Sequence, residues 1–266
     1  STQSEKKPGG AFALNDIKIR IAHISDTHIS PVGQFKPDFF EKAVREINKL
    51  DPEPNLVIHT GDLTDWGILE DYELALKKVD LLPEKKYFIP GNHDERNYGQ
   101  ELFRELFSKP DYEAREGNIA IYVMNSPEPD RDEGRLGRRR QEFLETRTKE
   151  LPRDTFKIVA LHHHVVPVPY SGREINVLED AGDVLELLLR NNVQLVLMGH
   201  RHVQRAIKIN NTLFVNAGTL SCVRTRARLG NSFNVIDIGE DGAITVQEVN
   251  LTKNTKTKLY EGEACR

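Results

Sequence analysis

Several apolar stretches of the chain each end in glycine, carboxylate, amide or imidazole side chains. The clearest covers residues 56–65, where an apolar run leads into Gly61 and Asp62. Such a run is typical of a buried strand whose last residues emerge at the edge of a sheet. Taken alone, Asp62 reads best as the cap of a following helix. The same pattern recurs at 21–28, 87–94, 158–164 and 195–202, however, and this favours a shared site at the ends of several strands.

The spacing of apolar residues between these stretches predicts alternating strands and helices. Alternating isoleucines from residue 17 to 21 indicate a first strand, and further strands are expected at 56–60, 86–89, 119–124, 157–161 and 194–198. The helical period predicts helices over about 37–50, 69–81, 100–107, 139–151 and 180–191. The first three strands alternate with helices, which implies parallel strands with right-handed crossovers. Their carboxyl ends therefore meet at one edge of the sheet.

Beyond residue 202 the pattern changes to short strands joined by turns, which is typical of antiparallel pairing. We expect these strands at 205–209, 212–216, 232–238 and 243–249. The sequence has no internal repeat, low-complexity tract or linker. We therefore predict an α/β fold with two sheets in a single domain over residues 16–251. Flexible tails are expected at 1–15 and 252–266.

Composition excludes some classes of function. The formal net charge of −4 gives no global field that would favour nucleic acid or an anionic membrane. No apolar run reaches the length of a membrane span. The two cysteines, Cys222 and Cys265, argue against a disulfide framework, so a reducing, cytoplasmic location is expected. The loops at 127–137 and 165–173 are expected to shape selectivity.

All nine histidines of the chain lie in the strand-end stretches. They are His23, His28, His59, His93, His162, His163, His164, His200 and His202. A lone histidine is usually structural, but this clustering indicates metal or phosphate chemistry. Imidazoles suit zinc, iron, copper or nickel, and carboxylates also admit manganese. We therefore predict two divalent or trivalent metal ions, with manganese, iron, zinc and nickel as the candidates.

A pair of metal ions would give these residues a specific chemistry. Two ions about 3.5–4 Å apart activate a bridging hydroxide and clamp phosphoryl oxygens. A central carboxylate can bridge both ions, and their surplus positive charge attracts a phosphate. His93 follows the candidate ligand Asn92 and is placed to give a proton to the leaving oxygen. The expected reaction is the hydrolysis of a phosphodiester.

The order of these residues resembles that of a known family. The motifs are Asp26-x-His28, Gly61-Asp62, Gly91-Asn92-His93-Asp94, His162 and Gly199-His200-x-His202. Over roughly residues 17–240 they look like the calcineurin-like metallophosphoesterases. The resemblance implies two mixed β-sheets packed as a sandwich and flanked by helices, a four-layer αββα fold.

The resemblance also implies the roles of individual residues. The first metal would be held by Asp26, His28, Asp62 and His202, and the second by Asp62, Asn92, His162 and His200. Asp62 would bridge the two ions and, with His93, form the catalytic pair. His93 would contact the substrate phosphate. Asn92 is a further candidate contact, and so is Arg201, which faces solvent by default but stands between two ligands in the sequence. The first histidine of the triplet is the usual ligand, but His163 and His164 stay open as alternatives.

Departures from other branches narrow the resemblance. Position 65 is aspartate where purple acid phosphatases place a tyrosine, and His93 stands where the lipid-A-pathway pyrophosphatases have arginine. Protein Ser/Thr phosphatases carry glutamate at the position of Asp94. What remains is similar to the class III cyclic-nucleotide and glycerophosphodiester phosphodiesterases. A cyclic nucleotide or another small phosphodiester is therefore the expected substrate.

Other interpretations remain open at this point. A nuclease or phosphomonoesterase of the same superfamily is the main alternative, although the net charge does not favour nucleic acid. A non-catalytic scaffold predicts missing ligands, yet all are present. His23, His59, Asp65 and Asp94 are expected to support the ligands rather than to act. The alternating arginines at 224, 226 and 228 fit an exposed loop or strand edge better than a phosphate site, and the oligomeric state, homo-oligomer included, is undecided.

Overall fold

The computed structural model describes residues 17–172 and 177–262, and these form two six-stranded sheets. The first sheet has the order β12-β11-β10-β1-β2-β3. Its strands are β1 (Ile17–Ile24), β2 (Leu56–His59), β3 (Lys86–Phe88), β10 (Ser232–Gly239), β11 (Ile244–Asn250) and β12 (Thr255–Gly262). The second sheet has the order β4-β5-β6-β7-β9-β8. Its strands are β4 (Tyr112–Glu116), β5 (Ile119–Val123), β6 (Phe156–Ala160), β7 (Leu195–Met198), β8 (Arg205–Ile209) and β9 (Thr212–Asn216).

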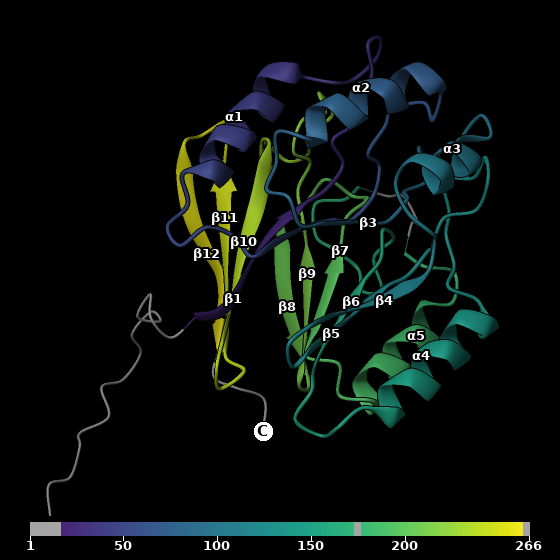
Figure 1. The fold of residues 1–266 in the computed structure, drawn as a ribbon, viewed down its shortest axis with the longest axis vertical. Coiled ribbons are helices and arrows are strands. Elements are labelled where there is room, and N and C mark those ends of the chain that lie inside the picture. Colours follow the sequence, from purple (N-terminus) through teal and green to yellow (C-terminus); the bar gives the residue numbers. More distant parts are fainter. Residues whose placement is uncertain (1–16, 173–176, 263–266) are drawn as a thin grey trace, which may run out of the picture.

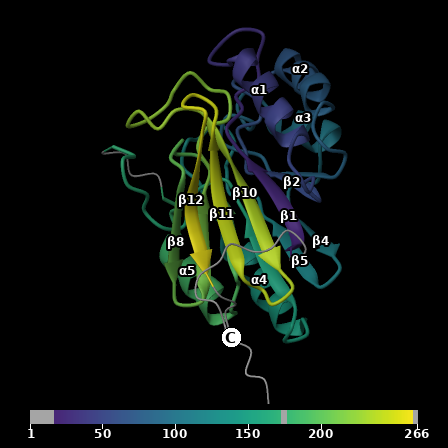
Figure 2. The same cartoon turned by 90° about the vertical axis from the view of Figure 1, so that its left-hand side faces the viewer.

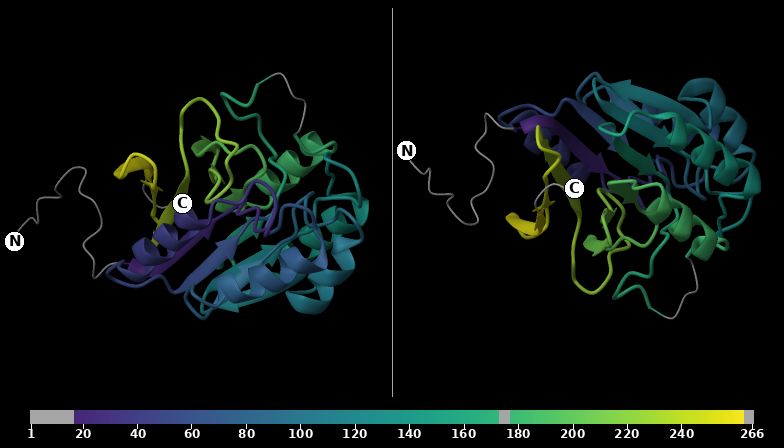
Figure 3. Two further views of the ribbon diagram at one scale, coloured as in Figure 1. Left: turned by 90° about the horizontal axis from the view of Figure 1, so that it is seen from above. Right: turned by 90° about the horizontal axis from the view of Figure 1, so that it is seen from below.

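The helices form two groups, one for each sheet (Figures 1 and 2). The first group consists of α1 (Pro37–Asn48), α2 (Leu69–Val79) and α3 (Gly99–Leu106), and the second of α4 (Arg138–Glu150) and α5 (Ala181–Arg190). Seen from above, the purple and blue helices α1 and α2 and the green helix α5 lie on opposite sides of the strands (Figure 3). The arrangement is the predicted four-layer αββα sandwich.

Strand β1 shows why the layers stack in this way. Ile19 and Ile21 belong to the core between the two sheets, together with residues such as Ile158 and Leu197 of the second sheet. Ala22 and Ile24 point to the opposite face and pack with the residues of α1 and α2. Both faces of β1 are therefore covered in its second half, although Lys18, Arg20 and His23 interrupt its apolar residues.

The register of the parallel strands brings the candidate residues together. Strands β1, β2 and β3 are parallel, and Ile24, His59 and Phe88 lie opposite one another at their last positions. In the second sheet, β6 and β7 are parallel, with Ala160 opposite Leu197. The loops that follow these five strands therefore leave the two sheets at the same end of the sandwich.

Two expectations from the sequence need correction, and both concern edge strands. Part of the segment expected to be a C-terminal tail is strand β12, which pairs antiparallel with β11 over residues 255–262. Strand β4, absent from the expected elements, pairs antiparallel with β5. Both are polar and mostly outside the core, so they lack the apolar alternation that marks an inner strand. The expected N-terminal tail at 1–15 lies outside the described residues, and no helix within them is long and apolar enough to cross a membrane.

Candidate metal centre

The predicted ligands occupy the loops that directly follow β1, β2, β3, β6 and β7. The loop after β1 lies alongside the loop after β2, because the N–H of Asp26 donates to the carbonyl of Gly61 (2.9 Å) and that of His28 to the carbonyl of Asp62 (3.0 Å). Five of the seven predicted ligands have a left-handed backbone: Asp26, His28, Asp62, His200 and His202, with φ between 50° and 74°. Non-glycine residues seldom adopt this conformation, and it concentrates at functional sites.

Two glycines of the motifs are required by close approach. Gly61 has φ of +99°, and a Cβ there would collide with the imidazole of His162. A Cβ on Gly91 would collide with the backbone nitrogen and the carboxylate of Asp62. A larger residue at position 61 would displace His162, and one at position 91 would push the loop of Asp62 away from the loop of Asn92. These two glycines therefore set the distance between the loops.

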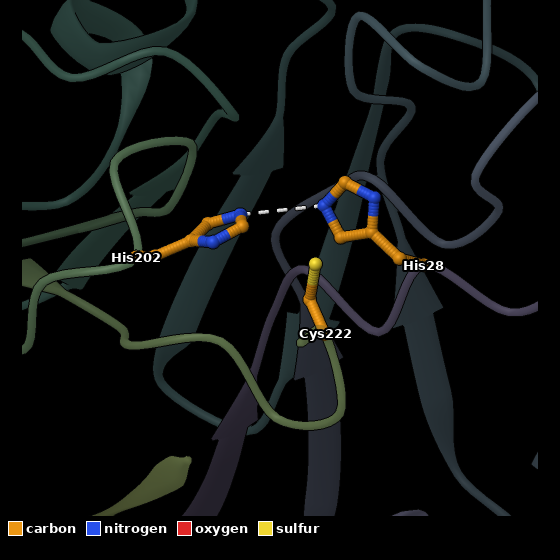
Figure 4. Close-up of side chains that lie close together, drawn as sticks. All are labelled: His28, His202 and Cys222. Atoms are coloured by element: carbon orange, nitrogen blue, oxygen red, sulfur yellow. Dashed lines mark hydrogen bonds between the residues drawn. The ribbon is translucent and has the colours of Figure 1, made fainter. Parts of the chain in front are cut away.

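The first cluster consists of Asp26, His28, Asp62 and His202. The Nε2 atoms of His28 and His202 lie 3.3 Å apart, and the Asp26 Oδ1 lies 3.3 Å from the His202 Nε2 and 3.8 Å from the His28 Nε2. The Asp62 Oδ2 lies 3.5 Å from the His28 Nε2. Figure 4 shows the imidazoles of His28 and His202 facing each other, with the sulfur of Cys222 beside the gap. These are the four residues implied for the first metal.

The second cluster consists of Asp62, Asn92, His162 and His200. The Asn92 Oδ1 lies 3.0 Å from the His162 Nε2 and 3.1 Å from the His200 Nδ1. The same Oδ2 of Asp62 that approaches His28 lies 3.5 Å from the His162 Nε2. Asp62 thus stands between the two clusters.

The geometry separates the members of the histidine triplet. His163 turns away from the second cluster, since its Nδ1 lies 2.8 Å from the Ser126 hydroxyl and its Nε2 lies 2.8 Å from the carbonyl of Asp132. His164 belongs to neither cluster. Among the three, His162 is the one whose ring nitrogen points at Asn92 and Asp62.

The donor set fits a pair of metal ions. Among the described residues, the buried Oδ1 of Asp26, which lies in the first cluster, has no hydrogen-bond partner. A buried polar atom without a partner is rare in native proteins, and an ion would satisfy it. Carboxylate oxygens, an amide oxygen and imidazole nitrogens are ligands that manganese, iron, zinc and nickel accept.

The electrostatics of the two clusters also favour bound metal ions. Burial lowers the pKa of His162, but the Asp62 carboxylate outweighs this effect and raises it to about 9. Burial raises the pKa of Asp62, yet the surrounding histidines, His162 first, hold it well below its usual range. The carboxylate therefore attracts positive charge strongly. A metal ion in the same place would replace the proton of the histidine, because only a neutral imidazole can be a ligand.

A set of buried groups holds the ligand rings in orientation. The Nδ1 of His28 lies 2.9 Å from the Asp65 Oδ1, that of His162 lies 2.6 Å from the carbonyl of Thr60, and that of His202 lies 2.6 Å from the carbonyl of Arg224. Each contact leaves the Nε2 atom facing the site. Such partners fix the tautomer of a metal-binding histidine. The contact of Asp65 with His28 fits the role expected for Asp65, which is to support a ligand rather than to act in catalysis.

His23 and His59 are buried below the ligand loops. The Nε2 of His23 lies 3.1 Å from the Thr60 hydroxyl, and the Nε2 of His59 lies 3.0 Å from the Thr27 hydroxyl. Burial lowers the pKa of each to about 3, so both are neutral at pH 7. They brace the loops without adding charge to the site.

His93 lies at the mouth of the site. Its Nδ1 is 2.7 Å from the carbonyl of Asp65, and its ring packs edge-on against that of His28. Burial lowers its pKa to about 4, and a phosphate anion beside it would raise that pKa. The Nδ1 donates to the carbonyl, so the Nε2 is the atom available to a ligand.

The two clusters open into a cavity of about 90 Å³. Besides the ligands, His93 and the predicted substrate contact Arg201, its walls include residues that were not predicted to belong to the site: Gln34, Arg96, Asp132, Arg224 and Arg226. Arg96 lies two residues after the Gly91–Asp94 motif, and this proximity could have marked it as a residue of the site. Asp132 comes from the 127–137 loop, and nothing local marks it among the other charged residues. It accepts from Arg96 (2.7 Å) and from the Asn92 amide (3.3 Å).

Residues 19–204 match the family model of the calcineurin-like phosphoesterases. The chain belongs to this family. The chain is 30% identical over 200 residues to a probable glycerophosphodiester phosphodiesterase GpdQ of Arcobacter nitrofigilis, a match that covers 70% of this chain and 71% of the relative. It is 28% identical to a 3′,5′-cyclic-nucleotide phosphodiesterase of Nostoc over 70% of this chain and 72% of that one.

Solved structures of low sequence identity share the fold of this calcineurin-like phosphoesterase. A dimetal phosphatase from Danio rerio aligns with a TM-score of 0.70 at 12% identity, over 93% of this chain and 100% of that one. A purple acid phosphatase from yellow lupin aligns with a TM-score of 0.71 at 14% identity, over 91% of this chain and 52% of that one. The predicted family and the predicted fold are both confirmed.

Proposed function

We propose that this calcineurin-like phosphoesterase is a dinuclear metal-dependent phosphodiesterase of small substrates. The observation that carries the proposal is the position of Asp62. One oxygen of its carboxylate lies 3.5 Å from a ring nitrogen of the first cluster and 3.5 Å from one of the second. A shared carboxylate between two sets of nitrogen ligands is the arrangement that a two-metal site requires.

Asp26, His28 and His202 would hold one ion, Asn92, His162 and His200 the other, and Asp62 would hold both. When bound, ions of this kind lower the pKa of water and neutralise charge on a phosphoryl group. The chain itself supplies position and proton transfer. The Asn92 amide is fixed by Asp132 at 3.3 Å, and the carbonyl of Asp65 fixes the His93 ring at 2.7 Å.

The role of His93 follows from that orientation. With its Nδ1 proton given to the Asp65 carbonyl, the imidazole presents its Nε2 to the cavity. An anionic phosphate near this ring favours the protonated form. His93 would then donate from Nε2 to the leaving alcohol oxygen as the ester bond breaks.

The substrate class is proposed from the cavity and from the relatives. A volume of about 90 Å³ has room for a phosphoryl group and part of its ester. The two relatives are named as a probable glycerophosphodiester phosphodiesterase and a 3′,5′-cyclic-nucleotide phosphodiesterase, and both names denote small diesters. We favour a cyclic nucleotide or another small phosphodiester over nucleic acid for this chain.

The test is hydrolysis of bis-p-nitrophenyl phosphate by protein of measured metal content, with manganese added. Asp62→Asn should abolish turnover and reduce bound metal, whereas Asp183→Asn, on an exposed turn of α5, should leave both unchanged. A panel of cyclic nucleotides, glycerophosphodiesters, phosphomonoesters and oligonucleotides separates the diesterase from the monoesterase and nuclease alternatives. Metal-loaded protein that cleaves none of these esters would refute the proposal.

A further inference from the structure

Guanidinium groups dominate one wall of the cavity. Arg201, Arg224 and Arg226 line it together with the metal ligands, and all three come from the segments after β7 and β9. Two carboxylates are among the described residues that line the cavity. Asp62 stands between the clusters, and Asp132 forms an ion pair of 2.7 Å with Arg96.

Arg224 differs from its two neighbours in how it is held. Arg201 and Arg226 both donate to the carbonyl of Ser171. Arg224 is fixed through its backbone, because its N–H donates to the Cys222 Sγ (3.4 Å) and its carbonyl faces the His202 Nδ1 (2.6 Å). Within 17–172 and 177–262, no hydrogen bond or ion pair engages its guanidinium. The backbone of Arg224 thus belongs to the support of the metal centre while its exposed side chain stays available.

The charge of the proposed centre leaves the guanidinium of Arg224 without a counterion. The seven predicted ligands include two carboxylates, Asp26 and Asp62, and with a bridging hydroxide two divalent ions would keep a surplus of one positive charge. A phosphodiester that carries one negative charge would neutralise this surplus, but not the charge of Arg224. A further anionic group of the substrate would therefore be attracted to Arg224.

We propose that Arg224 binds a second anionic group of the substrate. The inference rests on the proposed phosphodiesterase function and narrows its substrate class. The preferred substrate is a phosphodiester whose alcohol carries a phosphate or a carboxylate, since the planar fork of arginine matches both. Diesters with a cationic alcohol such as choline are disfavoured by the same wall.

The alternating arginines predicted to lie on an exposed loop or strand edge therefore divide into two kinds. They do lie in a loop, but Arg224 and Arg226 line the cavity and Arg228 does not. Arg228 is exposed, is in the same loop, and no hydrogen bond or ion pair with the described residues engages its side chain. It provides a matched control for Arg224.

The first test uses p-nitrophenyl phosphodiesters that differ in the charge of the second alcohol. The alcohols are 2-phosphoethyl and 3-carboxypropyl (anionic), 3,3-dimethylbutyl (neutral) and choline (cationic, of the same shape as the neutral one). Wild-type kcat/KM should fall from anionic to neutral to cationic esters. For each variant we compare kcat/KM for the anionic ester with kcat/KM for the neutral ester. Arg224→Gln should reduce the ratio of these two values by about tenfold, mainly through a higher KM for the anionic ester, because a charge-assisted hydrogen bond is lost.

Three controls make the result specific. Arg224→Lys should restore part of the preference for the anionic ester, and Arg228→Gln should leave this preference at the wild-type value. Added KCl should reduce the preference, because the guanidinium of Arg224 is exposed and its charge is screened by salt. Metal content must match the wild type in every variant. Equal ratios in wild type and Arg224→Gln, or a preference for the neutral ester, would overturn the inference while leaving the phosphodiesterase function intact.

A binding measurement keeps the two proposals distinguishable. Titration calorimetry of the metal-loaded protein compares phosphonoacetate, which carries a second anion, with methylphosphonate, which does not. Arg224→Gln should weaken phosphonoacetate about tenfold more than methylphosphonate. Protein that cleaves none of the esters but shows this difference would refute the proposed reaction and support the anion site. Equal weakening of both ligands would reject the anion site.

Discussion

Asp94 joins two of the loops that carry the second cluster, those after β2 and β3, and its removal is the sharpest test of how the site is built. Its carboxylate accepts hydrogen bonds from the N–H groups of Leu63 (3.0 Å), Thr64 (2.8 Å) and Gly91 (2.8 Å), and from the Thr64 hydroxyl (2.8 Å). Burial and the nearby Asp62 raise the pKa of Asp94 to about 6, so the group is ionised at neutral pH. It therefore fixes the loop of Asp62 against the loop that follows β3.

The magnitude follows from the donors that would lose their acceptor. Asp94→Ala leaves three backbone N–H groups and one hydroxyl unpaired in a buried place, and each such donor costs about 1–3 kcal/mol. Water entering the vacated space satisfies some of them, and removal of a buried charge close to Asp62 offsets part of the rest, so we expect a loss of about 4 kcal/mol in the free energy of unfolding. For a chain of this size that corresponds to a fall in Tm of about 8–16 °C.

The assay is urea denaturation and calorimetry at pH 7.5, combined with measurement of manganese affinity. Asp241→Ala is the matched control, because Asp241 accepts one hydrogen bond in an exposed turn and its loss should change stability by less than about 1 kcal/mol. Asp94→Asn keeps the shape of the side chain but places an amide N–H₂ group against some of the same donors. Its loss of stability should lie between those of Asp94→Ala and Asp241→Ala. If Asp94→Ala lost less than 1 kcal/mol and bound manganese like the wild type, the account of the joined loops would be wrong.

Three further predictions address the site and its surroundings. Chelation of bound metal should lower Tm by several degrees and readdition of manganese should restore it, since a ligand that binds only the folded chain stabilises it by about 2.7 kcal/mol at 100 times its Kd; an unchanged Tm would argue against an ion in the clusters. Asp65→Asn should weaken metal binding by about 10- to 100-fold through the lost orientation of His28, as calorimetry of metal binding would show, and unaltered affinity would deny Asp65 that role. Burial and Asp94 raise the pKa of Glu95 from 4.5 to about 8, so the folded chain keeps a proton that the unfolded chain releases, and stability is lost as pH rises through this window. Glu95→Gln should flatten the dependence of the free energy of unfolding on pH between 5 and 7.5, and an unaltered slope would contradict the assigned pKa.

The sequence by itself determined the inner strands, the helices and the position of the candidate ligands at the strand ends. Isoleucines at alternating positions 17, 19 and 21 predict β1, and this signal is contained in the strand itself. The motifs around Asp26, Asp62 and His200 were equally readable, because carboxylate and imidazole side chains directly follow an apolar strand in each case. The αββα fold and the family could therefore be predicted from the order of the segments.

Only the tertiary structure decided which residues meet in space. The choice of His162 over His163 depends on ring directions that Ser126 and Asn92 fix from distant parts of the chain. The polar edge strands β4 and β12 gave no local signal, because an edge exposed to solvent needs no apolar alternation. Asp132 and Arg224 reach the cavity through the register of the two sheets and the course of the loops. Sequence periodicity reports only burial within one element, whereas the distance between two loops is set by the packing of all the elements between them.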